Sequence, residues 1–149
     1  MISETARIAD QLRRSYYGRA WHGPALSELL SGVTAKQASG KPIAAGHSIH
    51  ELVQHAAFWQ RLTLGALHGT PIPRDESADW PSTLDPWESA LTELRRVTDD
   101  LAAAIDSFPT VKLENIVPGR EYSFACLLHG IVQHNLYHAG QIAILKKAL

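Results

Sequence analysis

The chain has 149 residues, of which 19% are charged, and its formal net charge at pH 7 is −1. A charge balance this close to neutral gives no reason to expect nucleic acid or an anionic membrane as a partner. No apolar stretch approaches the roughly 20 residues of a transmembrane helix. The single cysteine, Cys126, excludes an intramolecular disulfide and fits a reducing compartment. We therefore expect one soluble domain over residues 1–149, located in the cytoplasm.

The hydrophobic pattern predicts long helices in chain order. Ser48-Ile49-His50-Glu51 is a capping box at the start of the second helix. Asp85-Pro86-Trp87-Glu88 predicts the start of the third helix, with an Asp cap and Pro at the first helical position, and Pro109 ends that helix. We expect four long helices, at about residues 3–17, 48–67, 85–108 and 123–148.

The segments between these helices are uneven in length. Two short helical turns, Ala25–Leu30 and one that opens at Thr34, are predicted between the first and second helices. The connection from Gly69 to Asp85 is longer than the usual turn of a bundle, and it either covers an opening or wraps the surface. Only Val111–Val117 has the character of an extended segment. The predicted fold class is all-α: a four-helix bundle with a short helical excursion between helices 1 and 2 and a long helix 2–3 connection.

Two of the eight histidines form the most informative pattern in the chain. His134 and His138 are one turn apart on the fourth predicted helix and point the same way. Such a pair offers two nitrogen donors to one divalent metal ion. The zinc-protease signature also needs a Glu directly after the first His, as general base, but this position holds Asn135. The pair therefore indicates a metal site without the protease base, and it needs a third ligand.

His55 is the best third ligand. It shares a face of the second predicted helix with Leu52 and Trp59, which directs it inward. A single inward histidine is more often a hydrogen-bonded core residue than a metal ligand. Two adjacent buried imidazoles are different, because their burial costs desolvation and neither can satisfy the other fully. A shared metal removes that cost, so we predict a metal site made of His55, His134 and His138.

Two residues lie at spacings that would let them support these ligands. Glu51 is one turn before His55 and could accept the second ring proton of that histidine, although its place in the capping box explains it equally well. Gln141, three residues after His138, could bond a ligand or a bound water. No residue presents itself as a general base, so the catalytic residues stay unassigned.

Other notable side chains have structural interpretations. His129 lies opposite His138 on the helical wheel, and His47 and His50 are expected to be exposed. Cys126 is expected at the opposite edge of the helix from His134, as a small apolar residue and not a ligand. Large aromatic residues usually serve the core, and we expect this of Trp21, Trp59 and Trp87.

Several motifs, in this order and spacing, resemble the DinB-like (DinB/YfiT) superfamily of metal-binding four-helix bundles. The most recognisable of them is the segment from His134 to Ile142, and the resemblance covers most of the chain. The other motifs are Trp21-His22-Gly23-Pro24, the segment from His47 to His55, and Pro118-Gly119-Arg120-Glu121-Tyr122. One departure is His50, where an aromatic such as Trp is more usual.

The resemblance implies a three-His site at His55, His134 and His138, the same set that the helical wheel selects. It also implies a long connection between the second and third helices, and often a homodimer. Related members include thiol transferases that act with bacillithiol, mycothiol or glutathione, and maleylpyruvate isomerases. Many other members have no assigned activity.

Three neutral imidazoles leave a divalent metal with its +2 charge and an open position, which is the catalytic and not the structural pattern. Such a metal lowers the pKa of a bound water or holds a thiol as its thiolate. Nitrogen ligands suit zinc, nickel, iron or copper, and we expect zinc or nickel first. The sequence thus favours a metal-dependent thiol S-transferase or hydrolase with a small-molecule substrate, with or without a low-molecular-weight thiol as cofactor. The alternative is a non-catalytic metal-binding or structural bundle, or a ligand-binding protein, related to stress response.

Overall fold

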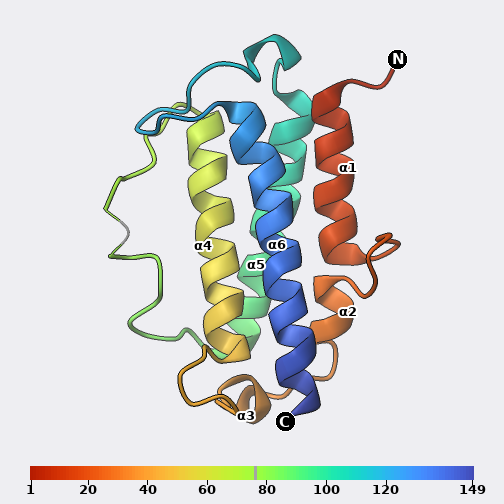
Figure 1. Cartoon of the computed structure of the whole chain (residues 1–149), viewed down its shortest axis with the longest axis vertical. Coiled ribbons are helices and arrows are strands. Elements are labelled where there is room, and N and C mark those ends of the chain that lie inside the picture. Colours follow the sequence, from red (N-terminus) through yellow and green to blue (C-terminus); the bar gives the residue numbers. More distant parts are fainter. Residues whose placement is uncertain (76) are drawn as a thin grey trace.

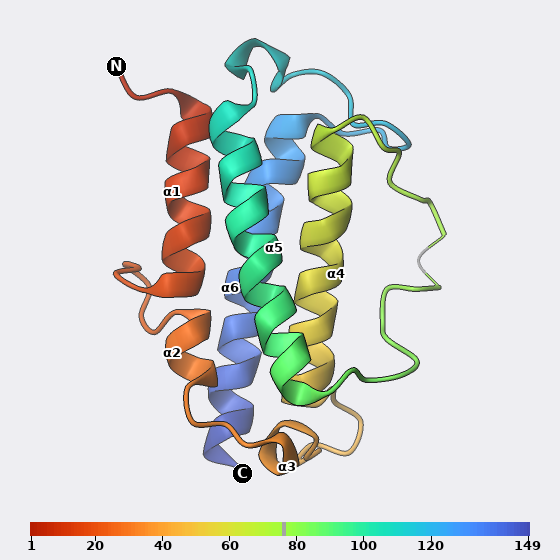
Figure 2. The ribbon, with the colours of Figure 1, turned by 180° about the vertical axis from the view of Figure 1, so that it is seen from behind.

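A computed structural model describes residues 1–75 and 77–149, which fold into a bundle of helices (Figures 1 and 2). The long helices, which confirm the predicted all-α class, are α1 (Glu4–Tyr17), α4 (Ile49–Leu67), α5 (Trp87–Ser107) and α6 (Phe124–Lys147). The short elements are α2 (Leu26–Leu30), α3 (Ala35–Ala38) and the 3-10 turn η1 (Thr110–Lys112). Within the described residues there is no strand, and Ile116 and Ser123 form an isolated bridge.

The helix starts at Thr34 and Ser48 follow the capping patterns of the sequence, and other helices also begin with a side-chain cap. The side chains of Ser3, Thr34, Ser48 and Ser123 each accept a hydrogen bond from a backbone N–H in the first turn of the helix that follows. The start of α5 differs from its prediction, because Asp85 does not cap it. The backbone N–H and carboxylate of Asp85 instead pair with the side-chain amide of Gln54 on α4, at 3.0 and 3.1 Å.

Helix α4 is enclosed on two sides, by α5 and by α6, while α1 packs against those same two helices. The residues between them form one apolar cluster around α2, α4 and the start of α5, and a second one where α1, α5 and α6 meet. Fully buried side chains such as Leu12, Leu94 and Ile142 each stabilise the fold by roughly 1.5–3 kcal/mol. The core therefore holds α4 and α6 beside each other along their length.

A buried polar chain fixes α6 against its neighbours. Asn135 is fully buried, and its amide nitrogen donates to the Ser15 hydroxyl of α1 at 3.3 Å. The amide oxygen of Asn135 accepts from Gln60 of α4 at 3.4 Å. Asn135 thus faces the bundle core, which explains its presence at the position where a zinc protease would carry its base.

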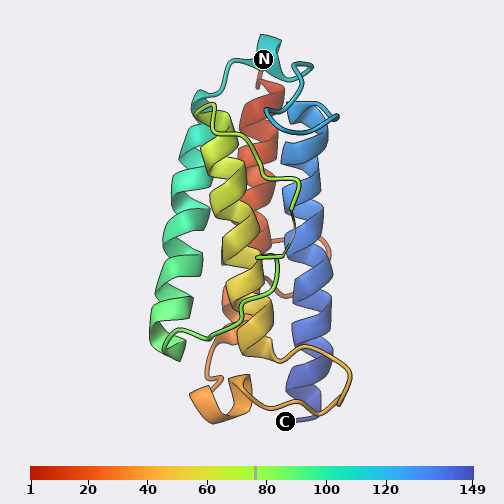
Figure 3. The same cartoon turned by 90° about the vertical axis from the view of Figure 1, so that its left-hand side faces the viewer.

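The long connection, described over residues 68–75 and 77–86, runs in front of α4 towards α6 (Figure 3). Its first part is anchored where the Ile72 N–H donates to the Pro118 carbonyl at 3.0 Å. Gly119 has a φ of +82°, and a Cβ there would lie 2.5 Å from the Ile72 carbonyl oxygen, so only glycine fits this contact. The Pro-Gly pair before α6 therefore holds the connection in place.

Two further sequence expectations need correction. Trp21 is not a core residue: it lies in the turn between α1 and α2 and is fully exposed, because it belongs to no helical face. The segment Val111–Val117 begins inside η1 and is extended only at its end, where Val117 donates to the Tyr122 carbonyl. In the described part of the chain, none of the helices combines the length and apolar character needed to cross a bilayer.

Replacing Asn135 by Ala should lower the free energy of unfolding by about 1–3 kcal/mol, since the Gln60 amide would be left buried without its partner. Urea denaturation of the variant and the parent chain measures this difference. Gln133→Ala, at an exposed position of the same helix, is the control and should change stability by less than about 0.5 kcal/mol. Equal stability of the two variants would show that the polar chain does not hold α6.

Candidate metal centre

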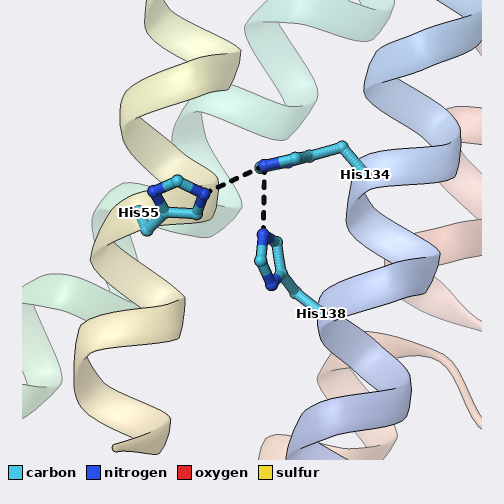
Figure 4. Close-up of side chains that lie close together, drawn as sticks. All are labelled: His55, His134 and His138. Atoms are coloured by element: carbon cyan, nitrogen blue, oxygen red, sulfur yellow. Dashed lines mark hydrogen bonds between the residues drawn. The ribbon is translucent and has the colours of Figure 1, made fainter. Parts of the chain in front are cut away.

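Three imidazoles converge between α4 and α6 (Figure 4). His55 comes from the middle of α4, while His134 and His138 come from successive turns of α6. The Nε2 atom of His134 lies 3.0 Å from the Nε2 atoms of both His55 and His138. The donor atoms of all three lie within 4.8 Å of one another, so the structure brings together the three residues predicted from the sequence.

Hydrogen bonds at the outer nitrogens orient two of these rings. The Nδ1 atom of His55 lies 2.9 Å from the backbone carbonyl oxygen of Asp79 and therefore carries the proton that it donates. The Nδ1 atom of His138 donates in the same way to Gln141 Oε1, at 2.6 Å. Both Nε2 atoms then keep a lone pair, and both lone pairs are directed at His134.

This arrangement suits a metal better than a hydrogen-bonded cluster. A proton on His134 Nε2 can serve only one of the two lone pairs that face it, which leaves the other without a donor. A metal ion would bind the lone pairs of all three nitrogen atoms. Nitrogen ligands of a tetrahedral zinc lie about 3.3 Å apart, given a zinc–nitrogen distance of about 2.0–2.1 Å. Reaching that geometry would widen the two observed separations of 3.0 Å slightly and shorten the third, which is within 4.8 Å.

The surroundings also favour the neutral imidazoles that a metal requires. Burial, and then the neighbouring His138 and His55, lower the pKa of His134 from 6.5 to about 3. Burial likewise lowers the pKa of His138, although its bond to Gln141 opposes this shift. Both rings are therefore neutral at pH 7, and no proton has to leave them when a cation binds.

The long connection supplies support that the sequence did not predict. The indole of Trp80 stacks on the His55 ring, with 3.9 Å between the ring centroids. Its other face stacks on the His47 ring, with 3.4 Å between the centroids. The Asp79 carboxylate lies 3.2 Å from His55 Nδ1 and accepts a hydrogen bond from the Trp59 indole. Asp79 and Trp80 come from an irregular segment, where no periodicity shows which side chains turn inward.

Glu51 does not support His55 as predicted, whereas Gln141 contacts the site directly. Glu51 completes the capping box with Ser48 and accepts from Lys41 at 2.9 Å. The partner of the His55 Nδ1 atom is Asp79 instead. The reason is that α4 turns Glu51 towards its own N-terminus, where the exposed backbone N–H groups attract a carboxylate.

The remaining histidines lie outside the cluster. His129 is half exposed and pairs with Glu4 of α1 at 3.2 Å, and His47 is exposed, as expected. His50 was expected to be exposed but is 95% buried, with its ring edge-on to Trp87. The helical wheel allowed α4 a single buried face, whereas α5 covers a second one.

The three-His assignment predicts which substitutions abolish metal binding. Isothermal titration of metal-free protein with zinc should give one site per chain, and His55→Ala or His138→Ala should remove it because two imidazoles hold the ion poorly. His129→Ala should bind as the parent chain does, since its ring pairs with Glu4 on another side of α6. Equal loss in all three variants would contradict the assignment.

The hydrogen bond behind His138 predicts a smaller effect. Gln141→Leu removes the acceptor of the His138 Nδ1 proton and should weaken zinc binding by about 10–100-fold. Glu51→Gln keeps the capping box and has no contact with the three rings to lose, so it should leave the affinity unchanged. Competition with a chromophoric chelator measures both values, and a larger loss in the Glu51 variant would reverse the two roles.

Comparison with known proteins places the chain in a family. The comparison with curated proteins found no match, and neither did the comparison with solved structures. The family model of the DinB superfamily matches residues 19–142, a range that includes α4, α5, the three histidines and most of α6. The chain belongs to the DinB superfamily, and its three-His cluster fits a metal-binding protein.

Proposed function

We propose that the protein is a metal-dependent enzyme of the thiol S-transferase or hydrolase type, with a divalent ion held by His55, His134 and His138. The observation that carries this proposal is the ligand set. Among the residues that the structure describes, no cysteine or carboxylate joins the three imidazoles as a fourth donor. A site closed by four protein ligands is typical of structural zinc, whereas three ligands leave a position for a reactant.

When bound, such an ion would supply a thiolate or hydroxide at neutral pH by lowering the pKa of the thiol or water that it holds. The protein's own residues prepare the position for it. Asp79 and Gln141 fix the ring orientations of His55 and His138 through their Nδ1 protons. Trp80 covers one face of His55 and keeps water from that side.

The same geometry bears on the identity of the metal. Three imidazole nitrogens suit zinc or nickel, which we propose first, as well as iron or copper. A low-molecular-weight thiol as cofactor and a small-molecule substrate are part of this proposal. The homodimer and the cytoplasmic location expected from the sequence stay predictions.

Cobalt(II) tests whether the site has an open position. Protein loaded with one equivalent of cobalt should gain a sulfur-to-cobalt absorption band when 2-mercaptoethanol is added, because the thiolate occupies the fourth position. A thioether of similar size, 2-(methylthio)ethanol, is the control and should give no such band. A cobalt spectrum that neither the thiol nor azide changes would show a closed site, and the ion would then only tie α4 to α6.

A further inference from the structure

An apolar cavity of about 280 Å³ lies beside His134, in the crevice between α4 and α6. His134 is part of its wall, so a molecule inside it would contact one of the three proposed metal ligands. Cys126, which the sequence analysis placed at the opposite edge of the helix from His134, lines the same cavity and is exposed. The two residues are eight positions apart, which on a helix is a rotation of only about 80°. The cavity therefore extends from the surface to His134.

No Asp, Glu, Lys or Arg side chain lines this cavity. Its walls are His134 together with Trp59, Thr63, Tyr122, Cys126, Leu127, Gly130 and Ile131. The two polar groups that α4 contributes are already paired, since the Trp59 indole donates to Asp79 and the Thr63 hydroxyl donates to the Trp59 carbonyl. In the metal-free protein, a charged ligand would lose its hydration here without meeting a charged side chain.

A second cavity, of about 290 Å³, shares Trp59 as a wall and differs in character. It lies between α4 and the long connection, and its walls include Asp75, Asp79 and Arg120. Ionic groups of a ligand would find partners there and not in the cavity that holds His134. The contrast across Trp59 indicates that the two spaces select different chemistry.

Gly130 leaves room in the apolar cavity. It lies one turn before His134 on α6, and a Cβ built at this position meets no atom within 4 Å. A side chain would therefore extend into open space without a clash. Gly140 on the same helix is equally unobstructed but does not line the cavity, so it provides a matched control.

We propose that this cavity binds the substrate of the metal site, that the substrate is a small, neutral, apolar molecule, and that Gly130 sets the space available to it. That the bound molecule is a substrate rests on the function proposed above. That the cavity binds such a molecule does not depend on that function. The volume is close to the lower end of the roughly 300–1,000 Å³ of ligand pockets, which suits a molecule of about one ring.

Fluorine NMR on metal-free protein tests this proposal, with 4-fluorotoluene as the neutral probe and 4-fluorobenzoate as its charged counterpart. The neutral probe should bind at least tenfold more tightly than the anion. Gly130→Leu should weaken the affinity for the neutral probe at least tenfold, and Gly140→Leu should leave that affinity unchanged. Equal binding to the two variants, or tighter binding of the anion, would overturn the proposal.

The single cysteine provides a second measurement on the unsubstituted chain. Saturating 4-fluorotoluene should slow the reaction of Cys126 with methyl methanethiolsulfonate several-fold, as followed by mass spectrometry, because both occupy the same cavity. An unchanged rate would place the probe elsewhere and contradict the proposal. Both measurements use protein without metal, so they can succeed or fail independently of the cobalt experiment.

Discussion

The site depends on one constraint: two imidazole lone pairs are aimed at a third imidazole by hydrogen bonds at their opposite ring nitrogens. Asp79 fixes the Nδ1 proton of His55, and Gln141 fixes that of His138. His134 cannot donate to both lone pairs at once, and burial keeps it neutral. A buried cluster with more acceptors than donors is costly unless a cation occupies it. The unbalanced set of nitrogens is therefore better explained by metal binding than by core packing.

The rest of the structure can be understood as support for that convergence. The buried chain through Ser15, Asn135 and Gln60 joins α1, α6 and α4, so the two helices that carry the three histidines are held by polar contacts as well as by apolar packing. The connection between α4 and α5 is pinned at Gly119 and then delivers Asp79 and Trp80 to the outer side of His55. Removing any of these supports should loosen the orientation of the rings before it unfolds the bundle.

The sequence predicted the features whose positions follow from helical periodicity. It did not predict the side chains whose positions depend on irregular backbone or on tertiary packing. The long helices and the three histidines of the candidate site follow from spacing, because residues three and four apart share a face of a helix. Asp79 and Trp80 could not be found in this way, since the loop that carries them has no repeating geometry. His50 was misplaced because a wheel with one buried face cannot represent a helix packed on two sides. Asp85 follows the pattern of a helix cap but pairs with Gln54, a choice that only the tertiary structure decides.

The most direct test of a three-imidazole site with an open position is X-ray absorption at the zinc edge, on untagged protein loaded with one equivalent of zinc. The account predicts three imidazole nitrogens and at least one light, non-protein ligand at about 2.0–2.1 Å. A fourth protein nitrogen or a sulfur ligand would contradict the open site. Zinc that is surrounded only by water, or that is lost on desalting, would contradict the metal centre itself and leave the three histidines as a polar part of the core.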